Sequence, residues 1–541
     1  MSDTAAQIIR RLGSMKSERS VHEHVWRACL DATYPELADG LSGDSVDAGT
    51  AQTKRAESMD STAADGVRML ASQVMGGMTP ANAVWPAFDV GDETDEEQRW
   101  LDHAAERVWE GIHGANYDAA KFEALLYVMC AGWMVLFIDE DRDRLTFQQF
   151  PIGQCYLAAS RQGGRIDTLY REFRLSAEQA VAQYGDEVSQ AVRDAAEKEP
   201  GKPFAFVHAI YPRTAYTPGS KLPRNLPFAS CHVEVASKKL VRESGYHEQP
   251  FVAPRWAQIP GSAYATGPVS QALPTIRRLN ELLKLESVAL SRAAAGVYVA
   301  ADDGVLNPRT VRVRGGTVIV ANSIDSIKEL PTGADFNVTF TKAEQMRAEI
   351  RRVLMADQLQ PQDGPAMTAT EVHVRVALIR QLLGPLYGRF QAEDLAPTVE
   401  RVFGLLYRRG RPELGGRPGS VAIDDAPESL DQTTYRVRFN NPLAKAQKLE
   451  EVSAIERTVM LAGAMAQQGK GEVLDLIDGD QGLRIAAEGL GAPSKLLRDE
   501  KALKAFRDRR AESQQQAAQA EQQQQLQTMA VGAALKQPAA A

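Results

Sequence analysis

The first candidate for chemistry is an apolar run that ends in two carboxylates, Val135–Glu140. An apolar strand followed by an acid holds magnesium in nucleotide hydrolases, but only together with a glycine-rich phosphate loop that ends in Lys-Ser or Lys-Thr. The nearest such loop, Gly463–Gly471, is one residue too long and lacks the hydroxyl residue after Lys470. The sequence therefore does not predict an NTPase.

Other patterns resemble metal sites but have the wrong spacing. The three aspartates at 139–143 match the start of a calcium loop, but Arg144 stands where glycine is needed and Phe150 where glutamate is needed. His22 and His24 are two residues apart on a predicted helix, so they point to different sides. The sequence contains no HExxH or GxSxG motif. We therefore expect no catalytic residue, no metal and no cofactor, and a protein that is not an enzyme.

Composition indicates a soluble globular protein of several structural units, with 541 residues, 44% hydrophobic and 24% charged. Proteins that grip DNA usually carry a basic surplus, so the net charge of −8 argues against tight wrapping of DNA but not against its passage. Four cysteines lie far apart without a CxxC pair, which predicts buried, reduced thiols. We find no signal peptide and no apolar stretch of about 18 residues, and therefore expect a cytosol-like compartment and no membrane.

Hydrophobic periodicity predicts an α+β first half. Helical spacing favours helices over 3–35, 52–78 (ending at Gly76-Gly77), 93–117 and 121–131. The period then changes to that of strands, with a hairpin at 133–150, strands near 166–174 and 203–211, and one strand over 232–243. Ser176 is a candidate N-cap for a following helix.

The centre of the chain is well patterned and contains no chemistry. We expect a helix at 269–293, a β-rich insertion at 296–339, a helix at 342–358, a loop at 360–367 and a long helix to 409, kinked at Pro385 and Pro397. A tube of helices capped by a small β domain would account for such a segment. The predicted apolar stripes of the two central helices are Ile276, Leu279, Leu283 and Leu290, and Met346, Ile350, Val353 and Leu354.

The C-terminal part returns to helical spacing after a predicted strand at 434–439. Helices are expected over 443–468 and 471–510. Residues 512–527 are rich in Gln and Ala, which leaves two alternatives open: a solvated helix stacked against copies of itself, or a disordered tail.

A series of motifs resembles the head-to-tail connectors, or portal proteins, of short-tailed, T7-like phages. The signature reads Arg255-Trp256, Gly261-Ser-Ala-Tyr264, Gly267-Pro268, Ala272-Leu-Pro274 and Leu279-Asn280. Segments at 70–80, 132–174, 367–371 and 388–397 continue the resemblance in order, so that it covers roughly residues 60–440. The sequence departs from the family at Ala265-Thr266 and Thr275, and matches little beyond about 445.

The resemblance implies the phage portal fold: α+β, mainly helical, with a strand-rich wing and a small α/β clip, assembled as a ring. Mapped onto this chain it gives the following regions: wing 1–265, first stem helix 266–293, clip 294–340, second stem helix 341–358, channel loop 359–368, a kinked helix returning to the wing 369–440, crown helices 441–510 and a tail 511–541.

The function implied is that of a portal, a dodecameric ring at one capsid vertex through which double-stranded DNA is packaged and ejected. The implied partners are the major capsid protein, the scaffold protein, the large terminase subunit, and tail adaptor or nozzle proteins, in a virion assembled in the host cytoplasm. Two alternatives remain: another virion structural protein such as a scaffold or internal core protein, and a packaging ATPase or nuclease.

Basic residues on the two predicted stem helices are the candidates for contact with DNA in the channel. They stand out because the chain as a whole is acidic, although solvation or salt bridges between subunits would explain them equally. An acidic lumen would reduce friction, while basic rings would slow slippage. With three residues of the loop, the predicted channel set is Arg277, Lys284, Lys342, Arg347, Arg351, Arg352, Gln360, Gln362 and Asp363.

Overall fold

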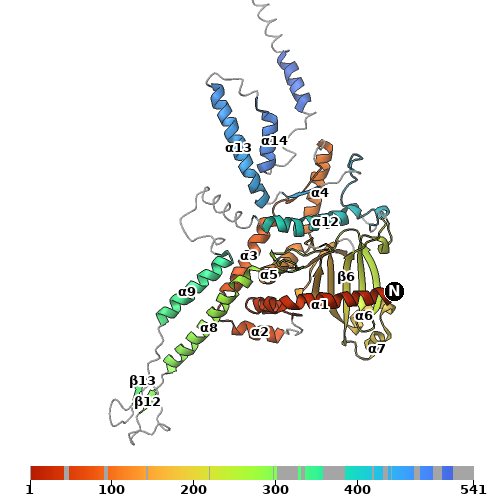
Figure 1. Ribbon diagram of the computed structural model, residues 1–541. Coiled ribbons are helices and arrows are strands. Elements are labelled where there is room, and N and C mark those ends of the chain that lie inside the picture. The colour runs from red at the N-terminus through yellow and green to blue at the C-terminus, as the bar shows by residue number, and fades with distance from the viewer. Residues whose placement is uncertain are drawn as a thin grey trace, which may run out of the picture. The chain divides into compact units, whose positions relative to one another are not determined.

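The computed structural model describes most of the chain as two compact units (Figure 1). The larger comprises Met1–Ala83 with Val108–Ile423, and the smaller Val84–Arg107 with Asp424–Ala541. The described residues are 2–41, 48–90, 95–141, 144–161, 163–217, 220–295, 298–300, 327–329, 336–356, 384, 386–416, 420–430, 436–439, 442–467, 476–490 and 503–515.

A five-stranded antiparallel sheet forms the main body of the larger unit. Its strands follow one another along the chain, and each pairs with the next. One face is covered by the long helix α1 (Ser2–Asp31), whose Ala5, Ile8, Leu12 and Met15 pack on Tyr170, Val207 and Cys231 (Figure 1). The strands are β4 (Cys155–Ala158), β5 (Thr168–Ser176), β6 (Pro203–Pro212), β7 (Phe228–Glu234) and β8 (Lys239–Tyr246).

Part of the opposite face is covered by two short helices, α6 (Ala177–Tyr184) and α7 (Gln190–Lys198). The predicted N-cap is confirmed: the Ser176 hydroxyl accepts a hydrogen bond from the backbone N–H of Gln179. In turn, the Gln179 side-chain oxygen accepts one from the backbone N–H of Ser176. Tyr184 of α6 and Val192 of α7 pack with Phe206 of the sheet. Helices therefore cover both faces of this sheet.

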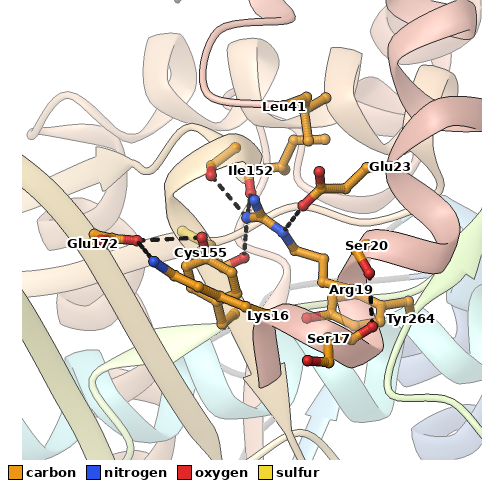
Figure 2. Close-up of polar contacts among 12 residues, drawn as sticks. Lys16, Ser17, Arg19, Ser20, Glu23, Leu41, Ile152, Cys155, Glu172 and Tyr264 are labelled. Atoms are coloured by element: carbon orange, nitrogen blue, oxygen red, sulfur yellow. Dashed lines mark hydrogen bonds and ion pairs between the residues drawn. The ribbon is translucent and has the colours of Figure 1, made fainter. Parts of the chain in front are cut away.

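Helix α1 is fixed to the sheet edge by a buried arginine (Figure 2). The Nη1 atom of Arg19 donates to the carbonyl oxygens of Ile152 at 3.1 Å, Gly153 at 2.8 Å and Cys155 at 2.9 Å, and its Nε lies 2.6 Å from Glu23. Only 3% of the Arg19 side chain is exposed. A charged donor that satisfies three buried carbonyls holds α1 in one register on the sheet.

A second, three-stranded sheet has the order β3-β2-β9. The predicted hairpin is confirmed as β2 (Leu136–Asp141) and β3 (Arg144–Gln149), and β2 also pairs with β9 (Phe251–Val252). A separate two-stranded pair is formed by β10 (Ala257–Gln258) and β11 (Ala265–Thr266). Short 3-10 turns lie at Pro35–Leu37, Ile152–Gln154, Gly185–Glu187, Pro223–Asn225 and Pro412–Leu414.

Helices form the rest of the larger unit. Its central pair is α8 and α9. The C-terminal part of the larger unit contains a π-helix, Gln391–Leu395, where a kinked helix was predicted. Pro397 lies in the first turn of the helix that follows. Pro385 lies outside the described residues. The other helices are α2 (Ala48–Glu57), α3 (Thr62–Met78), α5 (Tyr117–Ala131) and α12 (Ala396–Arg408).

The smaller unit joins two distant segments through one strand pair, β1 (Pro86–Asp89) with β14 (Arg436–Phe439). Trp85 stacks on Phe439 beside this pair, with ring centroids 6.3 Å apart. The first part of α4 (Asp95–His113), α13 (Pro442–Gln467), α14 (Gly479–Leu490) and a helix at 503–515 complete its described part. The helix predicted over 471–510 is wrong at 476–478, which is not α-helical.

Three further predictions of elements were wrong. The helix expected over 52–78 is interrupted at 58–61, because Asp60 accepts the backbone N–H of Thr62 and begins a new helix there. That helix continues through Gly76-Gly77 to Met78. The strand expected over 232–243 is two strands, because the chain turns back at Lys238, whose φ of 51° is left-handed. All four cysteines are free and buried, as expected.

Candidate functional site

The predicted stem is an antiparallel pair of helices, α8 (Pro268–Ala295) and α9 (Phe336–Val353), that extends from the body of the larger unit (Figure 1). Pro268 occupies the first helical position, where its missing N–H costs nothing. At the far end, β12 (Tyr298–Ala300) pairs antiparallel with β13 (Ile327–Glu329). Of the predicted β-rich insertion at 296–339, residues 296–297, 301–326 and 330–335 lie outside the described residues.

The base of this hairpin is packed against the body. Ile276 and Leu279 of α8, Ile350 of α9 and Leu354, which directly follows α9, are each at most 3% exposed. The Cδ1 atom of Leu354 would lie 2.7 Å from a Cβ atom added at Gly66, so α3 and the end of α9 approach as closely as a glycine allows. The base therefore belongs to the core of the unit.

The far half of the hairpin is different, because its apolar residues face solvent. Leu290 of the predicted apolar stripe of α8 is 58% exposed in the single chain, and α9 begins before the expected residue, at Phe336. The Phe336–Phe340 alternation is typical of a strand, but the segment continues the helix that packs along α8, so tertiary pairing overrides local propensity. The exposed apolar set is Leu285 (62%), Val288 (45%), Leu290 (58%), Val338 (56%) and Phe340 (62%).

Five of the six basic residues predicted for the channel lie on this hairpin without a described ion pair. Arg277, Lys284, Lys342 and Arg352 are exposed, and Arg351 is half-buried. Among the described residues, the Nζ atom of Lys342 donates only to Gln345 Oε1, at 3.2 Å. The loop candidates Gln360, Gln362 and Asp363 lie outside the described residues, so their role stays a prediction.

Arg347 differs, because it is bound within the chain. Its Nε atom lies 2.7 Å from Asp60 Oδ2 and its Nη1 atom 2.6 Å from Glu344 Oε1. Burial raises the pKa of the Asp60 carboxyl, but hydrogen bonds from Thr62 and Arg347 outweigh it and hold this pKa below its usual value. The hydrogen bond with Asp60 likewise raises the pKa of Arg347.

Sequence analysis missed Asp60, although one signal pointed to it. The run Asp60-Ser-Thr62 has the residue types that begin a helix, and the Asp60 side chain does so while holding Arg347. Arg347 thus connects α9 to the start of α3. Whether the six basic residues touch DNA stays a prediction.

Asp139 and Glu140, the two carboxylates that were compared with the magnesium-binding strand of nucleotide hydrolases, form ion pairs with arginines. Glu140 lies 2.6 Å from Arg409, and Asp139 lies 3.8 Å from Arg401. Within the described ranges, no group of three or more histidine, cysteine, aspartate or glutamate side chains is arranged to hold a metal ion. None of the described helices is long and apolar enough to cross a bilayer.

Comparison with known proteins identifies relatives over almost the whole chain. The model of the family described as "Bacteriophage head to tail connecting protein" matches residues 5–497. The chain is 27% identical to the portal protein of Salmonella phage epsilon15 over 560 residues, which covers 100% of this chain and 95% of that protein. It is 25% identical to the probable portal protein of Bordetella phage BPP-1 over 531 residues, covering 94% and 92%.

A solved structure titled "Virion of native gene transfer agent (GTA) particle" contains a chain that aligns with a TM-score of 0.36 at 12% identity, covering 75% of this chain and 88% of that one.

Proposed function

The chain belongs to the bacteriophage head to tail connecting protein family and has the function of a portal, and on that premise we propose that it assembles as a dodecameric ring around a DNA channel. The resemblance found in the sequence is thereby confirmed at the level of the family. A portal is a structural component of the virion at the connector between head and tail. In our proposal the protein has no enzymatic activity, and other proteins supply the force for packaging.

The observation that carries the ring is the exposed apolar surface of the α8–α9 hairpin. Leu285, Leu290 and Phe340 are each more than half exposed, although a soluble chain gains by covering such side chains. Burying apolar area stabilises by about 25 cal/mol per Å², so repeated contacts around a ring would add up. We therefore propose that the far half of each hairpin packs against the hairpins of neighbouring copies.

The regions of the portal remain proposals, with the bounds that the resemblance implies: stem helices 266–293 and 341–358, clip 294–340, channel loop 359–368 and crown 441–510. In this proposal α8 and α9 form the stem, and the two sheets are part of the wing. The exposed Arg277, Lys284, Lys342 and Arg352 would then be repeated around the channel, as would Arg351. A net charge of −8 per chain keeps DNA from being held tightly, while such rings slow its slippage.

The partners we propose are double-stranded DNA, the large terminase subunit at the clip, the major capsid and scaffold proteins around the wing, and tail adaptor or nozzle proteins after packaging. Assembly would take place in the host cytoplasm. These assignments rest on the family and on the proposed regions.

The test of the ring is the double variant Leu285→Ser with Phe340→Ser. The matched control is Val21→Ser, since Val21 is an apolar residue of α1 that is 65% exposed but lies outside the hairpin. We expect mass photometry and negative-stain images to show rings for the unaltered protein and for the control. The double variant should remain a monomer with an unchanged circular dichroism spectrum.

Two results would count against the proposal. One is a protein that stays monomeric at all salt and protein concentrations. The other is a double variant that forms rings at the same concentration as the unaltered chain.

A further inference from the structure

A row of four basic side chains crosses the five-stranded sheet on the face opposite α1. Arg171 of β5 stands opposite His208 of β6, His208 opposite His232 of β7, and His232 opposite Arg242 of β8. Residues directly opposite each other on neighbouring strands project from the same face. The four side chains therefore form one continuous row, which the portal function does not use.

The row lines one side of a cavity of about 600 Å³. Phe137 and Phe150 of the β2–β3 region line it as well, together with Arg401 and Arg408 of α12. Sites that bind small molecules have volumes of roughly 300–1,000 Å³. The cavity is therefore large enough for a nucleotide-sized ligand.

Two carboxylates, Asp139 and Glu140, line this cavity, and each pairs with an arginine of the α12 region, Arg401 or Arg409. Near α12, Glu248 lies 3.1 Å from Arg401 and 2.7 Å from Arg408, so those two arginines share a carboxylate. The Nε atom of Arg171, in contrast, donates to the neutral Gln154 at 3.1 Å, and its guanidinium lies 3.9 Å from the centre of the Phe150 ring. No carboxylate in the described part of the chain forms an ion pair with Arg171 or Arg242.

The two histidines between these arginines are held in their neutral form. Their rings stack with centroids 4.1 Å apart. His208 Nε2 is 2.9 Å from the Ser230 hydroxyl, and His232 Nδ1 is 2.9 Å from the Tyr184 hydroxyl. Burial, then the positive charge of Arg242 and Arg171, lowers the pKa of His232 to about 4. Burial, then the neighbouring His232, lowers the pKa of His208 well below its usual value.

We propose that this cavity binds the di- or triphosphate group of a small molecule, gripped at its two ends by Arg171 and Arg242 and bridged by His208 and His232. Neighbouring strands lie about 4.8 Å apart, so the two arginines start about 14 Å apart across three strand spacings. Both arginines line the cavity, and a guanidinium offers two parallel N–H groups to phosphate oxygens. A ligand with several phosphates therefore matches two separated arginines better than a single carboxylate does.

The same ligand chemistry could come from free pyrophosphate or from a nucleotide, and titration distinguishes them. We would titrate the full-length protein by isothermal calorimetry with sodium pyrophosphate, with dATP and with inorganic phosphate, at constant ionic strength and pH 7.5. Saturable binding of pyrophosphate and dATP, each tighter than inorganic phosphate, is the expected result. Tighter binding of dATP than of pyrophosphate would identify a nucleotide as the source.

The decisive variant is Arg242→Gln, because Arg242 is an exposed residue of β8 and its loss should leave the fold intact. The loss of a charge-assisted hydrogen bond, about 1.5–3 kcal/mol, corresponds to a dissociation constant that is at least tenfold larger. The matched control is Arg174→Gln, an exposed arginine of β5 outside the cavity lining, which should bind as the unaltered protein does. His232→Gln provides a second variant inside the row, with weaker binding expected.

The proposal is overturned if pyrophosphate and dATP give no saturable heat up to millimolar concentration. It is equally overturned if Arg242→Gln and Arg174→Gln bind alike. Ring assembly, followed in the same samples by mass photometry, is a separate readout, so loss of ligand binding is distinguishable from failure of the portal assignment.

Discussion

The five-stranded sheet buries charged and apolar side chains of kinds that the α8–α9 hairpin leaves exposed. At the sheet edge, Arg19 is buried and satisfied by three carbonyl oxygens, and α1 covers the apolar face. Along the hairpin, Leu285 and Phe340 face solvent, as do Lys342 and Arg352. One chain covers the apolar face of the sheet, whereas in our proposal neighbouring copies cover the far half of the hairpin. On that proposal, stability and assembly reside in different regions.

The largest effect is expected from Arg19→Met. This change removes the Arg19 hydrogen bonds to three buried carbonyl oxygens and the ion pair with Glu23, so we expect the free energy of unfolding to fall by about 3 kcal/mol. Lys16→Met is the matched control on the same helix. Its side chain is 43% exposed, and its ion pair with Glu172 should contribute less than about 1 kcal/mol. Urea denaturation of the subunit measures the free energy of unfolding of both variants. Equal losses in the two variants would contradict the expected difference between the buried arginine and the exposed lysine.

The next effect concerns acid stability of the sheet. The folded pKa of His232, about 4, is below the ordinary value near 6.5, so the unfolded chain takes up the proton first. Stability is thus complete above pH 6.5 and is lost as pH falls toward 4, by about 1.4 kcal/mol per pH unit in that window. Denaturation between pH 7 and 5.5 in phosphate-free buffer should show a shallower slope for His232→Gln. If the free energy of unfolding falls with pH equally in His232→Gln and in the unaltered protein, His232 does not contribute to the acid sensitivity.

A smaller effect is expected where the hairpin meets the body, at Arg347 and Asp60. Their side chains are 23% and 8% exposed, which makes this the most protected ion pair described in the hairpin. A double-mutant cycle with Asp60→Asn and Arg347→Gln should give a coupling of about 1 kcal/mol in the free energy of unfolding. A coupling near zero would mean that Arg347 is as available to DNA as its exposed neighbours.

The smallest effect is expected from Lys342→Gln with Arg352→Gln. Both side chains are exposed, and no acid in the described ranges pairs with either. The free energy of unfolding should therefore change by no more than about 0.5 kcal/mol. Rings of this variant should still form, because the apolar surface remains. A large loss of subunit stability would show that Lys342 or Arg352 makes contacts that stabilise the folded subunit.

Local patterns in the sequence predicted most elements. The N-cap at Ser176, the β2–β3 hairpin and α8 were found because period and turn chemistry are encoded within a few residues. Features made by distant pairing were missed. The strand-like Phe336–Phe340 became helix beside α8, and the row from Arg171 to Arg242 joins residues that are adjacent only across four strands.

The candidate site was predicted only as a set of residue types on two helices. The sequence placed basic residues along α8 and α9, but it could not show that Asp60 binds Arg347, because 287 positions separate them. Nor could it show that Leu290 lies in the exposed half of α8, since an apolar stripe looks the same whether a partner helix belongs to the same chain or to another.

The antiparallel pairing of α8 and α9 also bears on how such a protein can change over generations. The chain leaves the body along α8 and returns along α9, and Tyr298 stands opposite Glu329 where the two strands close the hairpin. The segment between them begins and ends at one place. Insertions, deletions or exchange of that segment by recombination would therefore leave the register of the hairpin and the sheets unaltered. A phage lineage could acquire a new docking partner there while inheriting the rest of the subunit intact.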